Sequence, residues 1–468
     1  MIHKYRLNGF NIVLDINSSS IHVVSDAAYD FLDFLDAKGR LNREYLLSNR
    51  VCELKEVADI SYVEEFEIII KEIRKLISEN KLFSGNINVG GFDTTSKLKS
   101  MCLNISHSCN LSCKYCFAQQ GTFGGKNCLM SLDIAKKSVD FLFKSNSYGE
   151  NVEIDFFGGE PLMNFDVLKK VVFYAKNKAK MLNKKIKFTI TTNGVLLNNE
   201  IIEFINKHID NVVLSLDGRK KVHDFMRGSS FDLIVPKFKK LVDMRDGKNY
   251  YIRGTFTRKN LDFLRDILEI YKLGFKRMSL EPVVLPSNIM YSINEDDLEK
   301  IIKEYESVSQ KIIEIKEKDD FVFFHFELNI DKSPCFLKRI KGCGCGVEYV
   351  AVTPSGDVYP CHQFVGIDKF KIENINNTQE LEKKIKKMYN FRRYRILTVT
   401  ECISCWAKYF CSGGCPANNW NFNKDLDLSY KISCKLIKKR LECAMMIQAA
   451  LRMKKVKTRN FVLNKKFC

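Results

Sequence analysis

The chain has 468 residues, 45% of them hydrophobic, so it is long enough for about three domains and can bury large cores. This composition excludes an intrinsically disordered protein. The chain has no apolar run long enough to span a membrane, and its first residues, Met-Ile-His-Lys-Tyr-Arg, lack the apolar segment of a signal peptide. We therefore expect a cytoplasmic protein with no membrane partner.

The net charge of +19 is unevenly distributed. Residues 1–90 contain 11 Lys and Arg and 14 Asp and Glu, a net charge of −3, so the remainder carries +22. The positive charge of residues 91–468 would attract acidic partners and speed their encounter. A proteome that is generally rich in lysine would give the same excess of positive charge. The 17 cysteines of a chain in a reducing compartment indicate metal ligands rather than disulfides.

Residues 1–85 are predicted to form a small α/β unit. Segments 12–15 and 21–24 are predicted as two short strands joined by a Ser-rich, hairpin-like turn. Three segments with apolar residues at helical spacing are predicted helices: 26–36, 43–47 and 63–80. This order is typical of a winged helix, but a net-negative unit is a poor phosphate binder. A version whose strand edge takes up an extended peptide is therefore favoured.

After a predicted linker at 86–99, residues 100–290 alternate between strands and helices. The predicted strands are 102–106, 152–157, 186–191, 212–216, 251–257 and 277–281, and helices are predicted over 131–144, 166–182 and 261–273. Each interval has room for a crossover helix, so the sheet should be parallel. Six such units form a partial (β/α)6 barrel, with chemistry at the carboxyl ends of the strands.

Two further regions follow the predicted barrel. Residues 291–333 are predicted as a helical connection, with a long charged helix over 296–318. Residues 334–468 form a third region, in which cysteines are crowded again.

Three cysteines follow the first barrel strand, in the run Cys109-Asn-Leu-Ser-Cys113-Lys-Tyr-Cys116. This C-x3-C-x2-C spacing supplies three thiolates from one short loop. Thiolates are the ligands of iron–sulfur clusters, and three of them leave one iron of a four-iron cluster open for a small molecule. A zinc knuckle or half of a disulfide framework is the alternative for three close cysteines.

The second strand ends in Gly158-Gly159-Glu160-Pro161, where two glycines let the backbone approach a ligand closely. Together with the cysteine loop, this segment resembles the radical S-adenosylmethionine (radical SAM) enzymes. The resemblance implies a [4Fe–4S] cluster on the three cysteines. It also implies that the Gly-Gly-Glu-Pro segment holds the amino group of SAM.

The same resemblance suggests four more SAM contacts. Thr192 and Ser215 lie at the ends of strands three and four, Tyr115 matches the aromatic residue next to adenine, and Arg227 matches an arginine that meets the SAM carboxylate or the substrate. Asn-Gly and Asp-Gly turn chemistry is a serious rival explanation for the neighbouring Asn193 and Asp217.

The last region contains Cys343 and Cys345, Gly356 followed by Cys361, and then C-x2-C-x5-C-x3-C and a final cysteine. This spacing resembles the SPASM domain, which holds two auxiliary [4Fe–4S] clusters, for a total of three. The family pattern assigns one cluster to Cys402, Cys405, Cys411 and Cys434, and the other to Cys343, Cys361 and Cys415. A treble-clef zinc site is the alternative.

Three options stay open for the fourth position of that second set. Cys335 fills it, Cys345 substitutes for Cys343, or the iron stays open for a substrate thiolate. Cys443 lies in an apolar helical run and is predicted to be core. The other cysteines, Cys52, Cys102, Cys128 and Cys468, receive no role.

His362 follows Cys361 at a position where the sulfatase maturases of this family typically have an aspartate that acts as a base. A neutral histidine is a candidate base there. A histidine packed beside a cluster is an equal alternative, so the catalytic base is otherwise unknown.

The whole pattern resembles the radical SAM maturases that form sulfur-to-α-carbon thioether bonds in ribosomal peptides, and among them the maturases of six-cysteine (SCIFF) peptides. The resemblance implies a precursor peptide whose leader binds the N-terminal unit, and an electron donor such as ferredoxin or flavodoxin. It also implies that hydrogen abstraction from an α-carbon, that of threonine in the SCIFF case, precedes bonding to a cysteine sulfur.

Two alternatives stay open. Formylglycine formation or carbon–carbon crosslinking would use the same cluster motifs. A metal-binding, winged-helix nucleic-acid binder is the alternative from another class, but the acidic N-terminal unit and Gly158 to Pro161 disfavour nucleic acid as a partner.

Overall fold

This computed structural model describes residues 1–53, 63–85, 97–146, 151–285, 289–328, 340, 342–388 and 395–464. Cys335, Cys468 and most of the predicted linker lie outside these residues. No described helix combines the length and the apolar character that crossing a membrane requires.

A parallel sheet forms the centre of the molecule, and it confirms all six predicted barrel strands. They are β4 (Ser100–Ser106), β5 (Asn151–Gly158), β6 (Lys185–Thr192), β7 (Asn211–Ser215), β8 (Tyr250–Phe256) and β9 (Arg277–Pro282). Each pairs in parallel with the next in chain order. On β5, the side chains of Val152, Ile154 and Phe156 are buried in the main core, so residues 153, 155 and 157 face the opposite side of the sheet.

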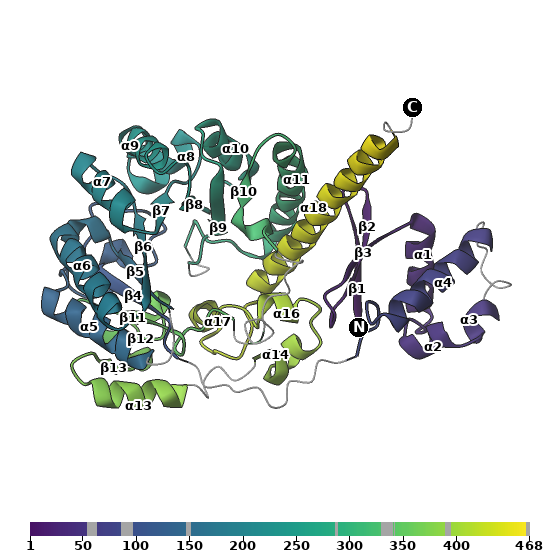
Figure 1. Cartoon of the computed structure of the whole chain (residues 1–468), viewed down its shortest axis with the longest axis horizontal. Coiled ribbons are helices and arrows are strands. Elements are labelled where there is room, and N and C mark those ends of the chain that lie inside the picture. Colours follow the sequence, from purple (N-terminus) through teal and green to yellow (C-terminus); the bar gives the residue numbers. More distant parts are fainter. Residues whose placement is uncertain are drawn as a thin grey trace.

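Helices cover the outer side of the curved sheet (Figure 1). They are α5 (Leu132–Ser145), α6 (Phe165–Met181), α7 (Asn199–His208), α8 (Lys220–Arg227), α9 (Phe231–Asp243), α10 (Leu264–Lys272) and α11 (Leu298–Lys316). The predicted helices at 131–144, 166–182, 261–273 and 296–318 are confirmed with small changes at their ends. Because each helix connects two parallel strands, the carboxyl ends of all six strands lie on one side.

The C-terminal region extends this sheet, which the sequence did not predict. β11 (Tyr349–Val352) pairs in parallel with β4, and β12 (Asp357–Tyr359) and β13 (Glu373–Asn374) follow antiparallel; β10 (Val322–Phe323) pairs with β9 at the other edge. The cysteine-rich region is therefore built directly onto the strand that precedes the Cys109 loop.

Short helices and one long helix complete the C-terminal region. They are α13 (Thr378–Met388), α14 (Arg395–Thr398), α15 (Thr400–Ile403), α16 (Lys408–Cys411), α17 (Pro416–Asn423) and α18 (Lys431–Asn464). Helix α18 packs against α11 and runs on to the N-terminal sheet (Figure 1).

The N-terminal unit has three antiparallel strands rather than the two predicted: β1 (Ile2–Leu7), β2 (Phe10–Asp15) and β3 (Ile21–Val24). Its helices are α1 (Asp26–Ala37), α2 (Arg43–Leu47), α3 (Arg50–Glu53) and α4 (Val63–Ser78), so the predicted helices at 26–36, 43–47 and 63–80 are confirmed. Val13 packs among these helices, whereas Tyr5, Leu7 and Ile12 belong to the main core. The sheet is thus shared between the two parts of the chain.

Polar contacts reinforce this junction. The ring of His3 stacks on Trp406 with centroids 3.8 Å apart, and His3 Nε2 lies 3.0 Å from Glu442 Oε1. The Tyr5 hydroxyl donates to the carbonyl oxygen of Glu442. The start of the chain is therefore attached both to α18 and to the residue that follows Cys405.

Two glycines at the end of β5 allow the backbones of neighbouring loops to meet. Gly159 N donates to Ser106 O, and Glu160 N donates to Ser108 O. Gly158 has φ +129°, and a Cβ there would lie 2.2 Å from Ser106 O; a Cβ on Gly159 would lie 2.3 Å from Ser108 O. Only glycine permits this approach, which positions the start of the cysteine loop.

Replacing Gly158 by Ala should therefore destabilise the fold by about 3 kcal/mol, because the added carbon overlaps a backbone carbonyl that cannot move away easily. Thermal unfolding followed by circular dichroism measures this as a lower Tm. Gly125→Ala is the matched control, since its Cβ would make only an ordinary 3.4 Å contact. Equal Tm values for the two variants would contradict the argument.

Candidate functional site

The loop after β4 gathers three of the predicted cluster ligands. Cys109, Cys113 and Cys116 are all partly exposed there. Burial raises the pKa of Cys109 to about 11, and the charges of Glu160 and of the other two cysteines raise it further. Burial also raises the pKa of Cys113. Thiols that hinder one another's ionisation in this way are a good ligand set for a cationic group.

The donor set fits a cluster better than it fits one ion. Among the described residues, no group of three or more His, Cys, Asp and Glu side chains is arranged to hold a single metal ion. The loop offers three thiols and no imidazole or carboxylate, which is the donor set of an iron–sulfur cluster. A Cβ on Gly121 would lie 3.2 Å from Cys109 Cβ and 2.7 Å from Gly159 Cα. The backbone of Gly121 therefore packs directly against Cys109 and Gly159, with no room for a side chain.

Glu160 links the end of β5 to the end of β6. Its carboxylate accepts hydrogen bonds from Thr192 Oγ1 (2.8 Å), Asn193 N (2.8 Å) and Leu162 N (3.1 Å). Burial raises the pKa of Glu160 to about 7, and these hydrogen bonds oppose that rise. Asn193 Nδ2 in turn lies 3.8 Å from Cys109 Sγ. Glu160 therefore positions the β6 end beside the cysteine loop, and its contact with a SAM ammonium stays a prediction.

Asp217 is the centre of a buried network that the sequence analysis missed. It accepts hydrogen bonds from the Tyr115 hydroxyl (2.6 and 2.8 Å), from Arg227 Nε (3.0 Å) and Nη2 (3.1 Å), and from Thr255 N (3.0 Å). The Arg227 guanidinium lies 5.4 Å from the Tyr115 ring centroid. Two predicted SAM contacts, Tyr115 and Arg227, are thus brought together by Asp217, for which turn chemistry was a rival explanation.

Ser215, the other predicted contact at this edge, ends β7 and is half-buried, in register with Arg253 on β8. Thr192 ends the neighbouring strand β6 and is buried. Thr192 and Ser215 therefore occupy the carboxyl ends of adjacent strands.

One group of C-terminal cysteines matches the first assignment made from the sequence. Burial raises the pKa of Cys411 to about 11, and the charges of Cys434, Cys402 and Cys405 raise it further. Cys405 and Cys411 also pack with Leu14 of β2 and Met445 of α18. The structure thus brings these four cysteines together, next to the N-terminal sheet.

A second group lies closer to the barrel. Burial raises the pKa of Cys415 to about 11, and the charges of Cys361 and Cys343 add to this rise. Cys361, Cys415 and Cys116 pack in the same apolar cluster. Cys345 is buried beside this group, and its backbone forms a bridge with Tyr349. Whether a fourth ligand completes the set stays open, because Cys335 lies outside the described residues.

Cys443 is buried, and its thiol donates to Tyr305 O, so its prediction as a core residue is confirmed. The Cys102 side chain is also buried, whereas Cys128 is exposed.

His362 lies between the second group and the barrel. Its Nδ1 is 3.1 Å from the Tyr349 hydroxyl, and its ring lies 4.9 Å from the Phe157 ring and 6.0 Å from that of Phe117. Phe157 precedes the Gly-Gly segment and Phe117 follows Cys116, so His362 faces the cysteine loop. Its role as a base stays a prediction.

The inner side of the barrel carries charged groups that the sequence analysis did not identify. Asp155 on β5 and Arg253 on β8 both lie on this face, and the charges of both act on Tyr251. Near the other edge, Glu281 Oε1 lies 3.4 Å from His325 Nε2. Strand alternation alone could have indicated them, since polar residues occupy every second position of otherwise apolar strands.

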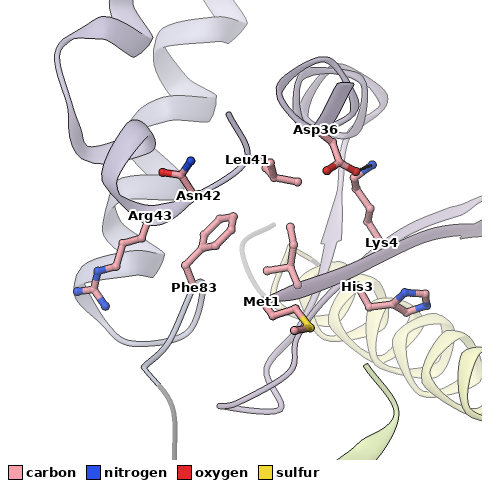
Figure 2. Close-up of a pocket in the computed structure, with 9 residues that line it drawn as sticks. Met1, His3, Lys4, Asp36, Leu41, Asn42, Arg43 and Phe83 are labelled. Atoms are coloured by element: carbon pink, nitrogen blue, oxygen red, sulfur yellow. Dashed lines mark ion pairs between the residues drawn. The ribbon is translucent and has the colours of Figure 1, made fainter. Parts of the chain in front are cut away.

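A separate pocket of about 550 Å³ opens in the N-terminal unit (Figure 2). Residues from β1, the end of α1 and the start of α2 line it, among them Lys4, Asp36, Leu41, Arg43 and Phe83. The first residues of β1 both line it and contact Trp406 through His3.

Comparison with known proteins finds a family model and several relatives that resemble this chain. The family model of the radical SAM superfamily matches residues 103–305. The radical SAM cyclopropyl synthase TigE of Paramaledivibacter caminithermalis is 26% identical over 434 residues, which cover 87% of this chain and 86% of TigE.

Two solved structures share the fold. The structure of anSMEcpe with bound AdoMet has a TM-score of 0.62 at 21% identity, covering 75% of this chain and 95% of that one. The structure of Streptococcus suis SuiB bound to the precursor peptide SuiA has a TM-score of 0.52 at 18% identity, covering 89% and 94%. The chain is thus similar to radical SAM proteins over residues 103–305, and similar relatives include anaerobic sulfatase-maturating enzymes and a bacteriocin biosynthesis protein.

Proposed function

We propose that this protein is a radical SAM maturase that forms cysteine sulfur-to-α-carbon thioether crosslinks in a Cys-rich, ribosomally made precursor peptide. The observation that carries the proposal is the presence of three separate cysteine groups, one on the loop of the radical SAM domain and two in the C-terminal region. Three [4Fe–4S] clusters and SAM are the proposed cofactors, and a ferredoxin or flavodoxin is the proposed reductant.

The residues of this chain would have the following roles. Cys109, Cys113 and Cys116 would hold the cluster that supplies one electron for the cleavage of SAM. Glu160 fixes the β6 end, and Asp217 fixes Tyr115 and Arg227. Cys116 packs in the same apolar cluster as Cys361 and Cys415. A cluster on the second group would therefore be well placed to accept the surplus electron of the substrate.

Carbon–carbon bond formation is the second candidate, because TigE, a cyclopropyl synthase by name, aligns with 87% of this chain. Both reactions remove two hydrogens, so the change in peptide mass alone does not separate them. A thioether consumes one thiol for each bond, whereas a carbon–carbon bond consumes none.

We expect the reconstituted protein, given SAM, a reductant and a Cys-rich precursor peptide, to lower the peptide mass by two hydrogens per crosslink. Alkylation with iodoacetamide should then label one thiol fewer for each lost pair. A peptide with every Cys replaced by Ser should keep its mass. Loss of hydrogen pairs with all thiols still alkylated would instead support the carbon–carbon reaction.

Changing Cys109, Cys113 and Cys116 together to Ala should abolish 5′-deoxyadenosine formation, because all three closely spaced thiols after β4 are then lost. The C-terminal cysteines form separate groups, so about two thirds of the bound iron should remain. Chromatography and iron analysis measure the two results. Replacing the exposed Cys128 by Ala is the control, and undiminished nucleoside from the triple variant would refute the assignment.

The N-terminal unit offers an edge for the leader peptide. Asp15 N donates to Ser20 O, so the hydrogen-bonded pairs of this hairpin fall at Asp15–Ser20, Val13–His22 and Asn11–Val24. The N–H groups of Ile21 and Val23 therefore point away from β2. They line the edge at which an added peptide strand would pair.

Val23→Pro should weaken binding of the precursor peptide about tenfold, because proline removes one edge donor without removing a bond to β2. Fluorescence anisotropy with a labelled precursor measures this change. Val23→Thr keeps the N–H and should bind like the original protein. Peptide-independent SAM cleavage should be the same in all three. Unchanged affinity in the proline variant would argue against docking at this edge.

A further inference from the structure

Asp155 is a carboxylate without a counter-ion in the interior of the barrel. It lies on the inner face of β5, in register with Cys102 on β4 and Thr189 on β6. It is half-buried, and no described Lys, Arg or His forms an ion pair with it. Carboxylates this enclosed are ordinarily paired, so an unpaired one inside a catalytic barrel marks a functional group.

Its position on the strand places Asp155 close to the reaction site. It lies two residues before Phe157 and three before Gly158, which at about 3.3 Å per residue is about 7 to 10 Å below the strand end. Phe157 on the same face packs against His362, which faces the cysteine loop through Phe117. A peptide segment entering the barrel from that end would reach Asp155 next.

The groups around Asp155 determine its proton affinity. Burial and, to a lesser extent, the charge of Glu153 raise the pKa of Asp155 to about 7 against a lowering effect of Thr189, whose hydroxyl also donates to Glu153 Oε1 (3.0 Å). Cys102, Tyr349 on β11 and Tyr251 on β8 face it from the neighbouring strands, and Arg253 acts on Tyr251 from the same side. Lys187, in register with Glu153, is the nearest cation on β6. A base with a pKa near 7 suits proton removal at neutral pH.

We propose that Asp155 is the base that removes the proton of the substrate during crosslinking. The proposal rests on the proposed function, the formation of a thioether. In that reaction, one hydrogen atom moves from the peptide α-carbon to the 5′-deoxyadenosyl radical, and the proton of the cysteine thiol moves to the Asp155 carboxylate. The sulfur–carbon bond forms, and the remaining electron passes to an auxiliary iron–sulfur cluster. His362 is less suited, because its Nδ1 is engaged by Tyr349 and its ring is enclosed by aromatic rings.

The test compares Asp155→Asn with Glu153→Gln, a carboxylate on the same face of the same strand. With the precursor peptide, SAM and reductant, the Asn variant should lose about 100-fold in crosslinked product. It should still transfer deuterium from an α-deuterated peptide to 5′-deoxyadenosine. In the original protein, the amount of crosslinked product formed per 5′-deoxyadenosine should increase as the pH is raised through 7. The same rise should move to lower pH in Glu153→Gln, because losing that negative charge lowers the pKa of Asp155.

A second readout does not depend on turnover. An infrared band of a protonated carboxyl should titrate near pH 7 in the substrate-free, cluster-loaded protein, and Asp155→Asn should remove one such component while that of Glu160 remains. Equal product and equal pH profiles for Asp155→Asn would overturn the proposal. If that variant does not fold, an unshifted profile in Glu153→Gln would overturn it. An original protein that makes no crosslink at all would instead refute the proposed function.

Discussion

The backbone contact between the end of β5 and the loop after β4 is the constraint on which the site depends. Gly158 and Gly159 have no side chains, so Ser106 O and Ser108 O can accept hydrogen bonds from the opposite backbone. This fixes where the cysteine loop begins, while Glu160, the next residue, extends the same linkage to β6. Three strand ends are therefore held in one arrangement before any cofactor binds, which is the preorganisation that positioned chemistry requires.

The C-terminal region is attached to this arrangement at both ends. Its strand β11 continues the sheet beside β4, which places Cys361 and Cys415 in one apolar cluster with Cys116. Its other cysteine group packs on Leu14 of the N-terminal sheet, where His3 also stacks on Trp406. Packing contacts therefore connect the N-terminal unit, proposed to recognise the peptide, with the cysteine groups of the proposed electron route. A structural change in one would alter the packing of the other.

Much of the barrel and the cysteine sets could be predicted from the sequence, because strand periodicity and ligand spacing are local properties. The six parallel strands follow from apolar runs separated by crossover helices. The sequence analysis did not identify β1 or β11, since their pairing depends on partners far away in the chain. Turn chemistry stayed a rival explanation for Asp217, because an Asp-Gly sequence does not reveal whether Arg227 binds the carboxylate.

Three inner carboxylates show why burial alone does not reveal function. Asp217 is fully buried, but Arg227 and Tyr115 satisfy it, so its task is to hold them. Glu160 is equally buried and is satisfied by three hydrogen bonds, which reduce the cost of its charge. Asp155 has no ion-pair partner among the described residues, and burial raises its pKa to about 7. Burial raises the pKa of Glu160 to the same value, so what separates Asp155 from the other two carboxylates is its lack of such partners and its place on the inner face of β5.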